Sequence, residues 1–328
     1  MPDSLAFTTS LFFRQSFYCS LRRLLFSSLA SLLLLFAACA SDTEEQDVRQ
    51  DDLGRDVSLT IPAERVIPLA PNITEQLVFI DASATLVGVG VSDDYPPDVV
   101  ASLPRINALP LDYEGIVELT PDLVLANAEV NNERDAETLA AVSVPTYFLE
   151  YRSLEDIGRT LRSLGELTGR TDTAETAADT LMAQLEKIRS LTSQASHRPT
   201  VLFLIGDETL YSYGEGSYVH ELIEVAGGKS VTSSFPMAAP VLSEEYVLTE
   251  KPDIIIGTFG PDYGASDLLA KHPTWDIVPA VAEDRVYTID PSLVTRPGPR
   301  VLRGVKKMAR AIHQDSLALP EAYLPNLP

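Results

Sequence analysis

The chain has 328 residues, of which 45% are hydrophobic and 22% are charged, so it holds enough apolar sequence for about two buried cores. Its 25 basic and 47 acidic residues give a formal net charge of −22. The composition excludes a disordered or fibrous chain. The negative field repels polyanions and argues against nucleic acid as a partner.

The first 38 residues predict a secretory signal peptide. Arg22-Arg23 precede an apolar run from Leu24 to Ala38, and small residues stand directly before Cys39. A basic patch, an apolar stretch and small residues before a cleavage site are the three parts of such a signal. The run is shorter than the roughly 20 residues that span a membrane, and an uncleaved anchor is the alternative.

Cys39 is the expected point of attachment to a membrane. Its position after Ala37-Ala38 resembles the lipobox of bacterial lipoproteins, in which the cysteine receives lipid and becomes the new N-terminus. This resemblance implies an exported protein that faces the periplasm or the cell exterior. Cleavage before Cys39 leaves one cysteine in the mature chain and therefore excludes an internal disulfide. The polar, acidic residues 39–52 predict a flexible tether.

Beyond residue 52 the sequence alternates between strand and helix patterns. Apolar residues recur on one face of a predicted helix over Leu154–Thr168. This alternation predicts an α/β fold with mainly parallel sheets that are covered on both faces. The expected strands are apolar or β-branched runs bounded by turn residues: Arg65–Ala70, Leu86–Val91, Leu123–Asn127, Thr146–Leu149, Thr200–Gly206, Leu210–Tyr213, Asp253–Thr258 and Arg285–Asp290.

A long helical pattern from Asp172 to Ser193 separates the first four strands from the last four. Its place between two α/β sets predicts a rigid connector, although packing wholly within one lobe is the alternative. The expected organisation is an N-terminal lobe (53–171), a connecting helix (172–195), a C-terminal lobe (196–315) and a tail (316–328).

A repeat indicates that the two lobes are built alike. The segment from Glu114 to Pro121-Asp122 and the apolar strand after it match, without a gap, the segment from Glu245 to Pro252-Asp253 and its strand. Matching elements in each half predict two similar Rossmann-like lobes. Ligands of open α/β sheets bind beyond the carboxyl ends of the strands, so we expect a ligand cleft between the lobes.

Six segments in chain order carry a resemblance to a known family: Asp52-x-Gly54-Arg55, Arg65 to Glu75, Leu86-Val-Gly-Val, Asp94-Tyr95-Pro96-Pro97, Glu114 to Val124 and Arg296-Pro-Gly-Pro-Arg300. Together they resemble the periplasmic-binding-protein family for cobalamin and ferric chelates, the helical-backbone metal receptors of ABC importers. The resemblance implies two lobes joined by one long rigid helix and only slight closure on the ligand. It also implies a small-molecule metal chelate as ligand and an ABC permease with its ATPase as partner.

Candidate ligand-binding residues in the N-terminal lobe follow its first two strands. Pro71 and Asn72 come after the first strand, where Asn72 either faces the ligand or caps the helix that begins there. Tyr95 follows the second strand and offers a flat apolar face with a polar tip, suited to the edge of a macrocycle. Packing against Pro96-Pro97 is the alternative for Tyr95.

Candidates in the C-terminal lobe are Tyr213, Phe259 and Arg296. Tyr213 belongs to a cluster of tyrosines, and Phe259 lies past a strand end. Arg296 comes after the last strand and before a Pro-Gly-Pro turn, where it could meet a phosphate or carboxylate of the ligand.

No motif for catalysis or for a resident metal stands out. Gly228-Lys229-Ser230 lacks the glycine that a phosphate loop needs at the position of Ile223, and the four histidines have no zinc-ligand spacing. We therefore expect a monomeric binding protein with no cofactor of its own. The segment Tyr95-Pro96-Pro97 resembles the cobalamin receptors of the family most, and this resemblance implies a corrinoid as ligand, with a ferric siderophore or haem as the alternative. A ligand sensor or an enzyme on this scaffold remains a further alternative.

Glu114 and Glu245 are the expected contacts with the permease. They occupy equivalent places in the repeat, so each lobe should present one of them on the same edge of the molecule. The resemblance implies that a two-fold permease meets both carboxylates with paired arginines. Each glutamate alternatively does no more than complement its helix dipole, and Glu244 competes with Glu245 for the role.

Overall fold

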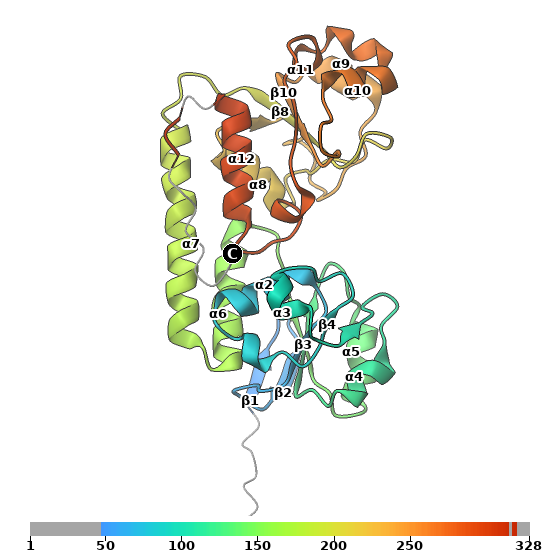
Figure 1. The fold of residues 1–328 in the computed structure, drawn as a ribbon, viewed down its shortest axis with the longest axis vertical. Helices are drawn as coiled ribbons and strands as arrows, with labels where there is room; N and C mark the ends of the chain where they lie inside the picture. Colours follow the sequence, from blue (N-terminus) through green and yellow to red (C-terminus); the bar gives the residue numbers. More distant parts are fainter. Residues whose placement is uncertain (1–46, 315–316, 320–328) are drawn as a thin grey trace, which may run out of the picture. The chain divides into compact units, whose positions relative to one another are not determined.

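The computed structural model describes residues 47–314 and 317–319 (Figure 1). The predicted signal peptide, Cys39, the first part of the predicted tether and most of the predicted tail lie outside these residues. Within the described ranges no helix is both long enough and apolar enough to cross a membrane.

The predicted tether of residues 39–52 is wrong for its last residues. Strand β1 (Asp47–Gln50) pairs antiparallel with β2 (Asp56–Leu59). The Asp51 carboxylate accepts hydrogen bonds from the backbone amides of Leu53 and Arg55 and from the Arg55 guanidinium. The acidic residues that suggested a solvated tether therefore close the turn of a hairpin, because aspartate accepts hydrogen bonds from nearby backbone amides.

The N-terminal lobe is built on a parallel sheet in the order β3-β6-β7 (Val66–Pro68, Leu123–Asn127 and Thr146–Leu149). A second, two-stranded parallel sheet joins β4 (Val89–Gly90) and β5 (Arg105–Ile106). The elements around these sheets are α2 (Pro71–Phe79), η1 (Ser83–Thr85), α3 (Pro97–Val100), α4 (Tyr113–Glu118), α5 (Glu133–Ala140) and α6 (Leu154–Thr168).

The C-terminal lobe holds a four-stranded parallel sheet in the order β11-β10-β8-β9 (Val286–Thr288, Ile254–Gly257, Thr200–Leu204 and Lys229–Ser230). The predicted strand Leu210–Tyr213 does not form, since Tyr211 makes single bridges and Ser212 bonds the Phe203 carbonyl through its side chain. The other elements are α8 (Tyr218–Val225), α9 (Glu244–Glu250), α10 (Ala265–Lys271), η2 (Pro273–Ile277), α11 (Pro279–Ala282), η3 (Pro291–Leu293) and α12 (Val301–His313).

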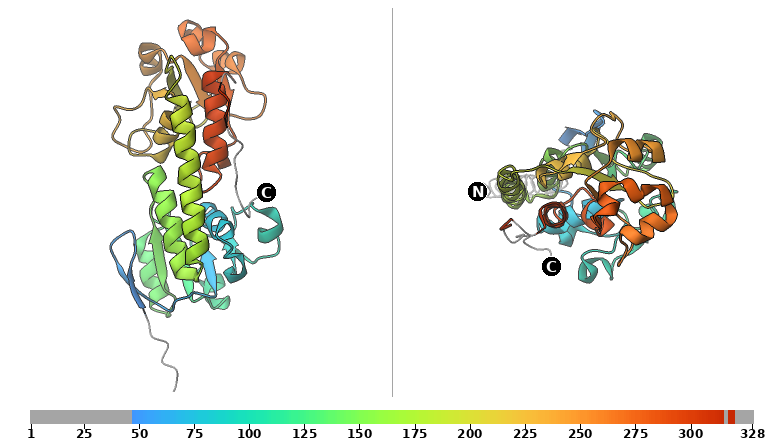
Figure 2. Two further views of the ribbon diagram at one scale, coloured as in Figure 1. Left: turned by 90° about the vertical axis from the view of Figure 1, so that its left-hand side faces the viewer. Right: turned by 90° about the horizontal axis from the view of Figure 1, so that it is seen from above.

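Helix α7 (Thr171–Thr192) runs along both lobes, as expected of the connector (Figures 1 and 2). It packs against α6 of the N-terminal lobe and against α8 and α12 of the C-terminal lobe, so packing within one lobe is wrong. Gly165 on α6 faces Ala174 on α7 so closely that a Cβ at position 165 would collide with the Ala174 methyl. This close approach ties α7 to α6 and makes a rigid hairpin of two helices.

The sequence repeat corresponds to two copies of one structural unit. Asp112 caps α4 and Ser243 caps α9, each through a side chain that accepts a hydrogen bond from a backbone amide of the first turn. The Asp122 carboxylate accepts from the backbone amide of Arg65, and the Asp253 carboxylate accepts from that of Thr200. In each lobe the Pro-Asp turn therefore fixes the start of a neighbouring strand, β3 in the N-terminal lobe and β8 in the C-terminal lobe.

Candidate functional site

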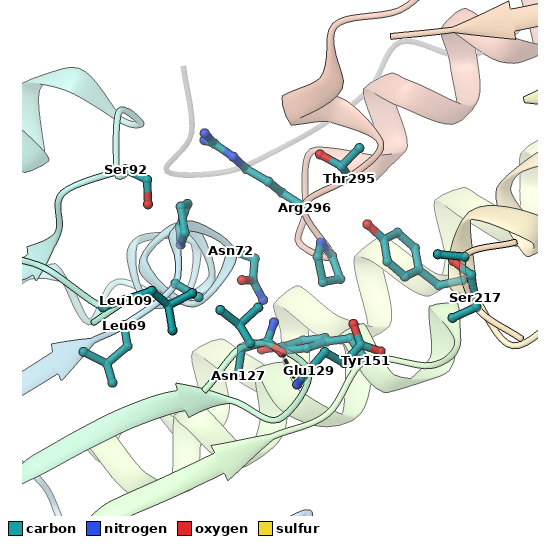
Figure 3. Close-up of a pocket in the computed structure, with 18 of the residues that line it drawn as sticks. Leu69, Asn72, Ser92, Leu109, Asn127, Glu129, Tyr151, Ser217, Thr295 and Arg296 are labelled. Atoms are coloured by element: carbon teal, nitrogen blue, oxygen red, sulfur yellow. Dashed lines mark hydrogen bonds between the residues drawn. The ribbon is translucent and has the colours of Figure 1, made fainter. Parts of the chain in front are cut away.

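A cavity of about 630 Å³ lies between the two lobes (Figure 3). Its volume falls within the range of about 300–1,000 Å³ that is usual for small-molecule sites. The N-terminal wall begins at the carboxyl ends of the parallel strands, where the first lining residues follow β3, β6 and β7, as ligand sites of open α/β sheets do. The lining residues are Leu69, Ala70, Pro71, Asn72, Val91, Ser92, Asn107, Ala108, Leu109, Asn127, Glu129, Val130, Tyr151, Tyr213, Ser217, Tyr218, Ala238, Ala239, Thr295, Arg296 and Pro297.

Four of the six predicted ligand-binding residues line this cavity: Pro71, Asn72, Tyr213 and Arg296. The alternative that Asn72 caps α2 is wrong, because Ala70 is the N-cap residue and the helix has no side-chain cap. Asn72 is 3% exposed, and its amide nitrogen has no hydrogen-bond partner among the described residues. A buried amide without a partner costs free energy, which a ligand carbonyl in the cavity would recover.

Arg296 lies at the cavity but is already paired. Its guanidinium contacts the carboxylates of Asp94 and Glu75, and this pairing holds the pKa of Asp94 below its usual range. Arg300 binds the same Glu75 carboxylate and stacks over the ring of Tyr95. Two guanidinium groups and two carboxylates therefore offset one another, so Arg296 offers less free positive charge to a ligand than its sequence position suggested.

Tyr95 and Phe259 are corrections to the predicted site, because neither lines the cavity. The Tyr95 ring lies under the Arg300 guanidinium, 4.0 Å from ring centroid to Cζ. Phe259 stacks on Tyr263 with 4.6 Å between ring centroids and packs against the core of the C-terminal lobe. Each of these rings therefore packs against another side chain of the protein and does not line the cavity.

Two aromatic residues, Tyr213 and Tyr151, are among the lining residues, and Tyr151 was not predicted. Burial raises the pKa of Tyr213 to about 12, and its hydroxyl has no hydrogen-bond partner in the described part of the chain. The Tyr151 hydroxyl accepts a hydrogen bond from Gln76 and is thereby fixed. Tyr213, which is partly exposed, therefore offers a flat apolar face of the kind that was expected from Tyr95, whereas only 1% of Tyr151 is exposed.

Glu129 and Asn127 are further lining residues that the sequence reasoning missed. Asn127 ends β6, and its side-chain oxygen accepts a hydrogen bond from the Glu129 backbone amide at 2.8 Å. Asn127, Glu129 and Tyr151 lie together along one side of the cavity, and Arg296 extends away from them (Figure 3). The rule that ligands meet strand ends could have identified all three from the predicted strands.

The predicted docking glutamates are both exposed and stand on equivalent helices, Glu114 in α4 and Glu245 in α9. Both helices lie on the side of the fold that faces away from α7, one in each lobe (Figure 1). Glu244 is held by His272, 3.0 Å from Oε1 to Nδ1, whereas Glu245 has no ion pair among residues 47–314. Of the two neighbours, Glu245 is therefore the carboxylate that is available to a partner.

No group of three histidine, cysteine, aspartate or glutamate side chains within the described ranges is arranged to hold a metal ion. The carboxylates nearest the cavity are instead engaged with arginines, apart from Glu129.

Comparisons with known proteins agree with this architecture. The sequence pattern of the family described as "Periplasmic binding protein" matches residues 66–293. A vitamin B12-binding protein of Pectobacterium carotovorum is 31% identical over 253 residues, which cover 75% of this chain and 87% of that protein. The uncharacterized ABC transporter substrate-binding lipoprotein YvrC of Bacillus subtilis is 24% identical over 88% of this chain and 96% of its own length.

A solved structure has the same fold. The periplasmic heme-binding protein RhuT of Roseiflexus, in its apo form, superimposes with a TM-score of 0.68 and 26% sequence identity. The alignment covers 77% of this chain and 98% of RhuT.

Proposed function

The chain belongs to the family of periplasmic binding proteins, and from this premise we propose that it is the substrate-binding lipoprotein of an ABC importer. In this function it captures a metal chelate between its lobes and delivers it to a permease that works with an ATPase. The cavity at the strand ends, lined from both lobes, is the observation that carries the proposal. Binding rather than catalysis is the role that this arrangement favours.

A corrinoid is the ligand that we propose. Relatives named vitamin B12-binding protein are 30–31% identical to this chain over three quarters of its length. The cavity offers tyrosine faces for a macrocycle and an unpaired Asn72 amide for a peripheral carbonyl group. Its one lining arginine is already paired with carboxylates, which disfavours a strongly anionic ferric siderophore.

Haem is the second candidate, favoured by the likeness to RhuT and by the free hydroxyl of Tyr213. A phenolate oxygen can ligate haem iron. The two propionates of haem would nevertheless need cationic partners that Arg296 is poorly placed to supply, and for this reason haem is second.

We also propose how the protein is anchored to the membrane and how it docks onto the permease. Lipidation of Cys39 would hold the monomeric receptor on the outer face of a membrane. Glu114 and Glu245 would pair with arginines on the two halves of the permease, one from each lobe. A ligand sensor on the same scaffold would need no such docking, so transport assays separate it from an importer component.

Calorimetric titration tests the ligand. The chain from residue 40 onward is titrated with cobalamin, cobinamide, haemin and several ferric siderophores. We expect saturable binding of cobalamin or cobinamide. Saturable binding of haemin or a siderophore alone would contradict the corrinoid. Calorimetry suits this protein because its sole tryptophan, Trp275, is buried, stacks on His272 and does not line the cavity.

A further inference from the structure

The charge on the cavity wall comes from two lining residues, Glu129 and Arg296. The Arg296 guanidinium contacts Asp94 Oδ1 and lies 3.3 Å from Glu75 Oε1, and Arg300 completes the group by binding Glu75. The two positive and two negative charges of this group balance. Glu129 therefore sets the sign of the charge that a ligand meets on the rest of the wall.

The Glu129 carboxylate is free to act on a ligand. It has no hydrogen bond or ion pair within residues 47–314, and only its backbone amide is bonded, to Asn127. Arg152 is the one positive charge that lowers the pKa of Glu129, and its guanidinium is bound to Glu150 at 2.6 Å. The Glu129 side chain is exposed at the cavity, where desolvation and the negative charge of Glu150 raise its pKa. These two effects outweigh the opposing effect of Arg152, so the protein compensates the negative charge of Glu129 only in part.

Two unpaired donors line the same cavity as this acceptor. The Asn72 amide nitrogen is buried without a partner, and the Tyr213 hydroxyl also lacks one in the part of the chain that the structure describes. The wall thus offers N–H and O–H donors together with one carboxylate acceptor. A primary amide matches this pattern, because its carbonyl accepts from Asn72 or Tyr213 and its NH₂ group donates to Glu129.

A carboxylate on the ligand does not match it. Such a group would bring a second negative charge to Glu129, and the one cation that lines the cavity, Arg296, is already paired with carboxylates. Specificity often depends on a repulsive element of this kind as well as on attractive contacts. Resting on the proposed function, we infer that Glu129 is a specificity determinant that admits chelates with amide side chains and rejects those with carboxylate side chains.

The test uses two ligands with one cobalt corrin ring. Cobinamide carries amides on the ring, whereas cobyrinic acid carries carboxylates at the same positions. Affinities for both are measured by calorimetry at pH 7.5 for the wild-type chain and for Glu129→Gln, which removes the charge and keeps the hydrogen-bonding shape. Glu133→Gln, an exposed carboxylate at the start of α5, is the matched control.

We expect the wild-type protein to prefer cobinamide by at least about 100-fold. Glu129→Gln should raise the affinity for cobyrinic acid about tenfold or more and change that for cobinamide by less than about threefold. Each tenfold change corresponds to about 1.4 kcal/mol. Glu133→Gln should leave both affinities unchanged.

Two results would overturn the inference, and they differ in what else they overturn. In the first, both corrins bind, and the ratio of their affinities is the same in the wild type and in Glu129→Gln, or it shifts equally in Glu133→Gln. Glu129 then does not set the specificity, but the corrinoid function stands. If neither corrin binds any of the three proteins, the proposed corrinoid function fails together with the inference.

Discussion

The carboxylate of Glu75 in the N-terminal lobe accepts two hydrogen bonds from the Arg300 guanidinium in the C-terminal lobe, 2.8 Å from Nε and 2.5 Å from Nη2. Glu75 lies within α2, and Arg300 directly precedes α12. Both side chains are buried, with 1% and 8% of their surface exposed. This pair joins the lobes beside the ligand cavity and complements the covalent link through α7.

Glu75→Gln should destabilise the protein strongly. The substitution leaves the buried Arg300 guanidinium without its carboxylate, and breaking one partner of a buried pair costs about 3–5 kcal/mol. Urea unfolding of the wild type and the variant measures the difference. Asp94→Asn is the control, because Asp94 is an exposed partner of Arg296 and should cost about 0–1 kcal/mol. Equal, small losses in the two variants would refute the structural role of the pair.

Asp93 should make the stability fall between about pH 4 and pH 6. Its side chain is buried, and desolvation raises its pKa from 3.8 to about 6, against the lowering effect of hydrogen bonds from Thr74 and Gly90. Because the folded protein holds this proton more tightly than the unfolded chain, unfolding releases it across this range. The contribution of Asp93 to the free energy of unfolding should therefore fall by roughly 2 kcal/mol as the pH rises from 4 to 7.

The measurement compares urea unfolding of the wild type and Asp93→Asn at several pH values. The asparagine variant does not titrate at this position, so other groups cancel in the difference. The wild type should lose stability relative to the variant as the pH rises. A difference that stays constant, or that grows in favour of the wild type, would contradict the raised pKa.

Glu114→Arg together with Glu245→Arg should abolish uptake while ligand affinity stays nearly unchanged. Both side chains are exposed and neither lines the cavity, and reversal of charge at a complementary interface costs several kcal/mol. If each glutamate merely complements its helix dipole, the cost is about 0.3–1 kcal/mol of stability and uptake survives. Ligand accumulation in cells that carry the importer is the measurement.

The control for the docking variant reverses two other charges on the same helices. Glu118 in α4 and Glu250 in α9 are also exposed, and they stand at the opposite ends of their helices from Glu114 and Glu245. Glu118→Arg with Glu250→Arg should leave uptake intact. Normal uptake by the folded Glu114/Glu245 variant, or equal loss in the control, would show that these glutamates do not dock the receptor.

Cys39→Ser should prevent attachment to the membrane, because only the thiol accepts the lipid. The serine variant should appear as a soluble exported protein or as an unprocessed precursor, and neither should incorporate labelled fatty acid. Membrane fractionation with fatty-acid labelling measures this. A variant that is processed normally and still carries label would contradict lipidation at Cys39, and an unlabelled wild type that remains in the membrane would support an uncleaved helix.

Most of the fold could be predicted because the periodic apolar residues of the sequence are the residues that the helices and strands bury. Helix α6 coincides with the predicted Leu154–Thr168, and α7 begins and ends within one residue of the predicted Asp172–Ser193. The segment 47–52 was not predictable from composition, since acidic residues either remain solvated or close a turn. Asp51 closes a turn because the hairpin places two backbone amides where they donate hydrogen bonds to its carboxylate.

The site was predicted in part because loops at strand ends were the correct place to look. Asn72 and Arg296 were found by this rule, whereas Glu129 follows a correctly predicted strand and was still missed. Tyr95 also follows a strand, but its ring packs under the guanidinium of Arg300, which is 205 positions later in the chain. Such a contact depends on how the two lobes meet, and local sequence carries no signal for it.

Location of the ligand tests the central claim that the cavity between the lobes binds a metal chelate. Crystals of the chain from residue 40 onward, grown with cobinamide, give an anomalous signal from cobalt that marks the metal directly. We expect one cobalt peak inside the cavity, with the corrin ring in contact with Asn72 and Tyr213. A cobalt peak elsewhere on the protein, or no peak at a cobinamide concentration that saturates binding in solution, would contradict it.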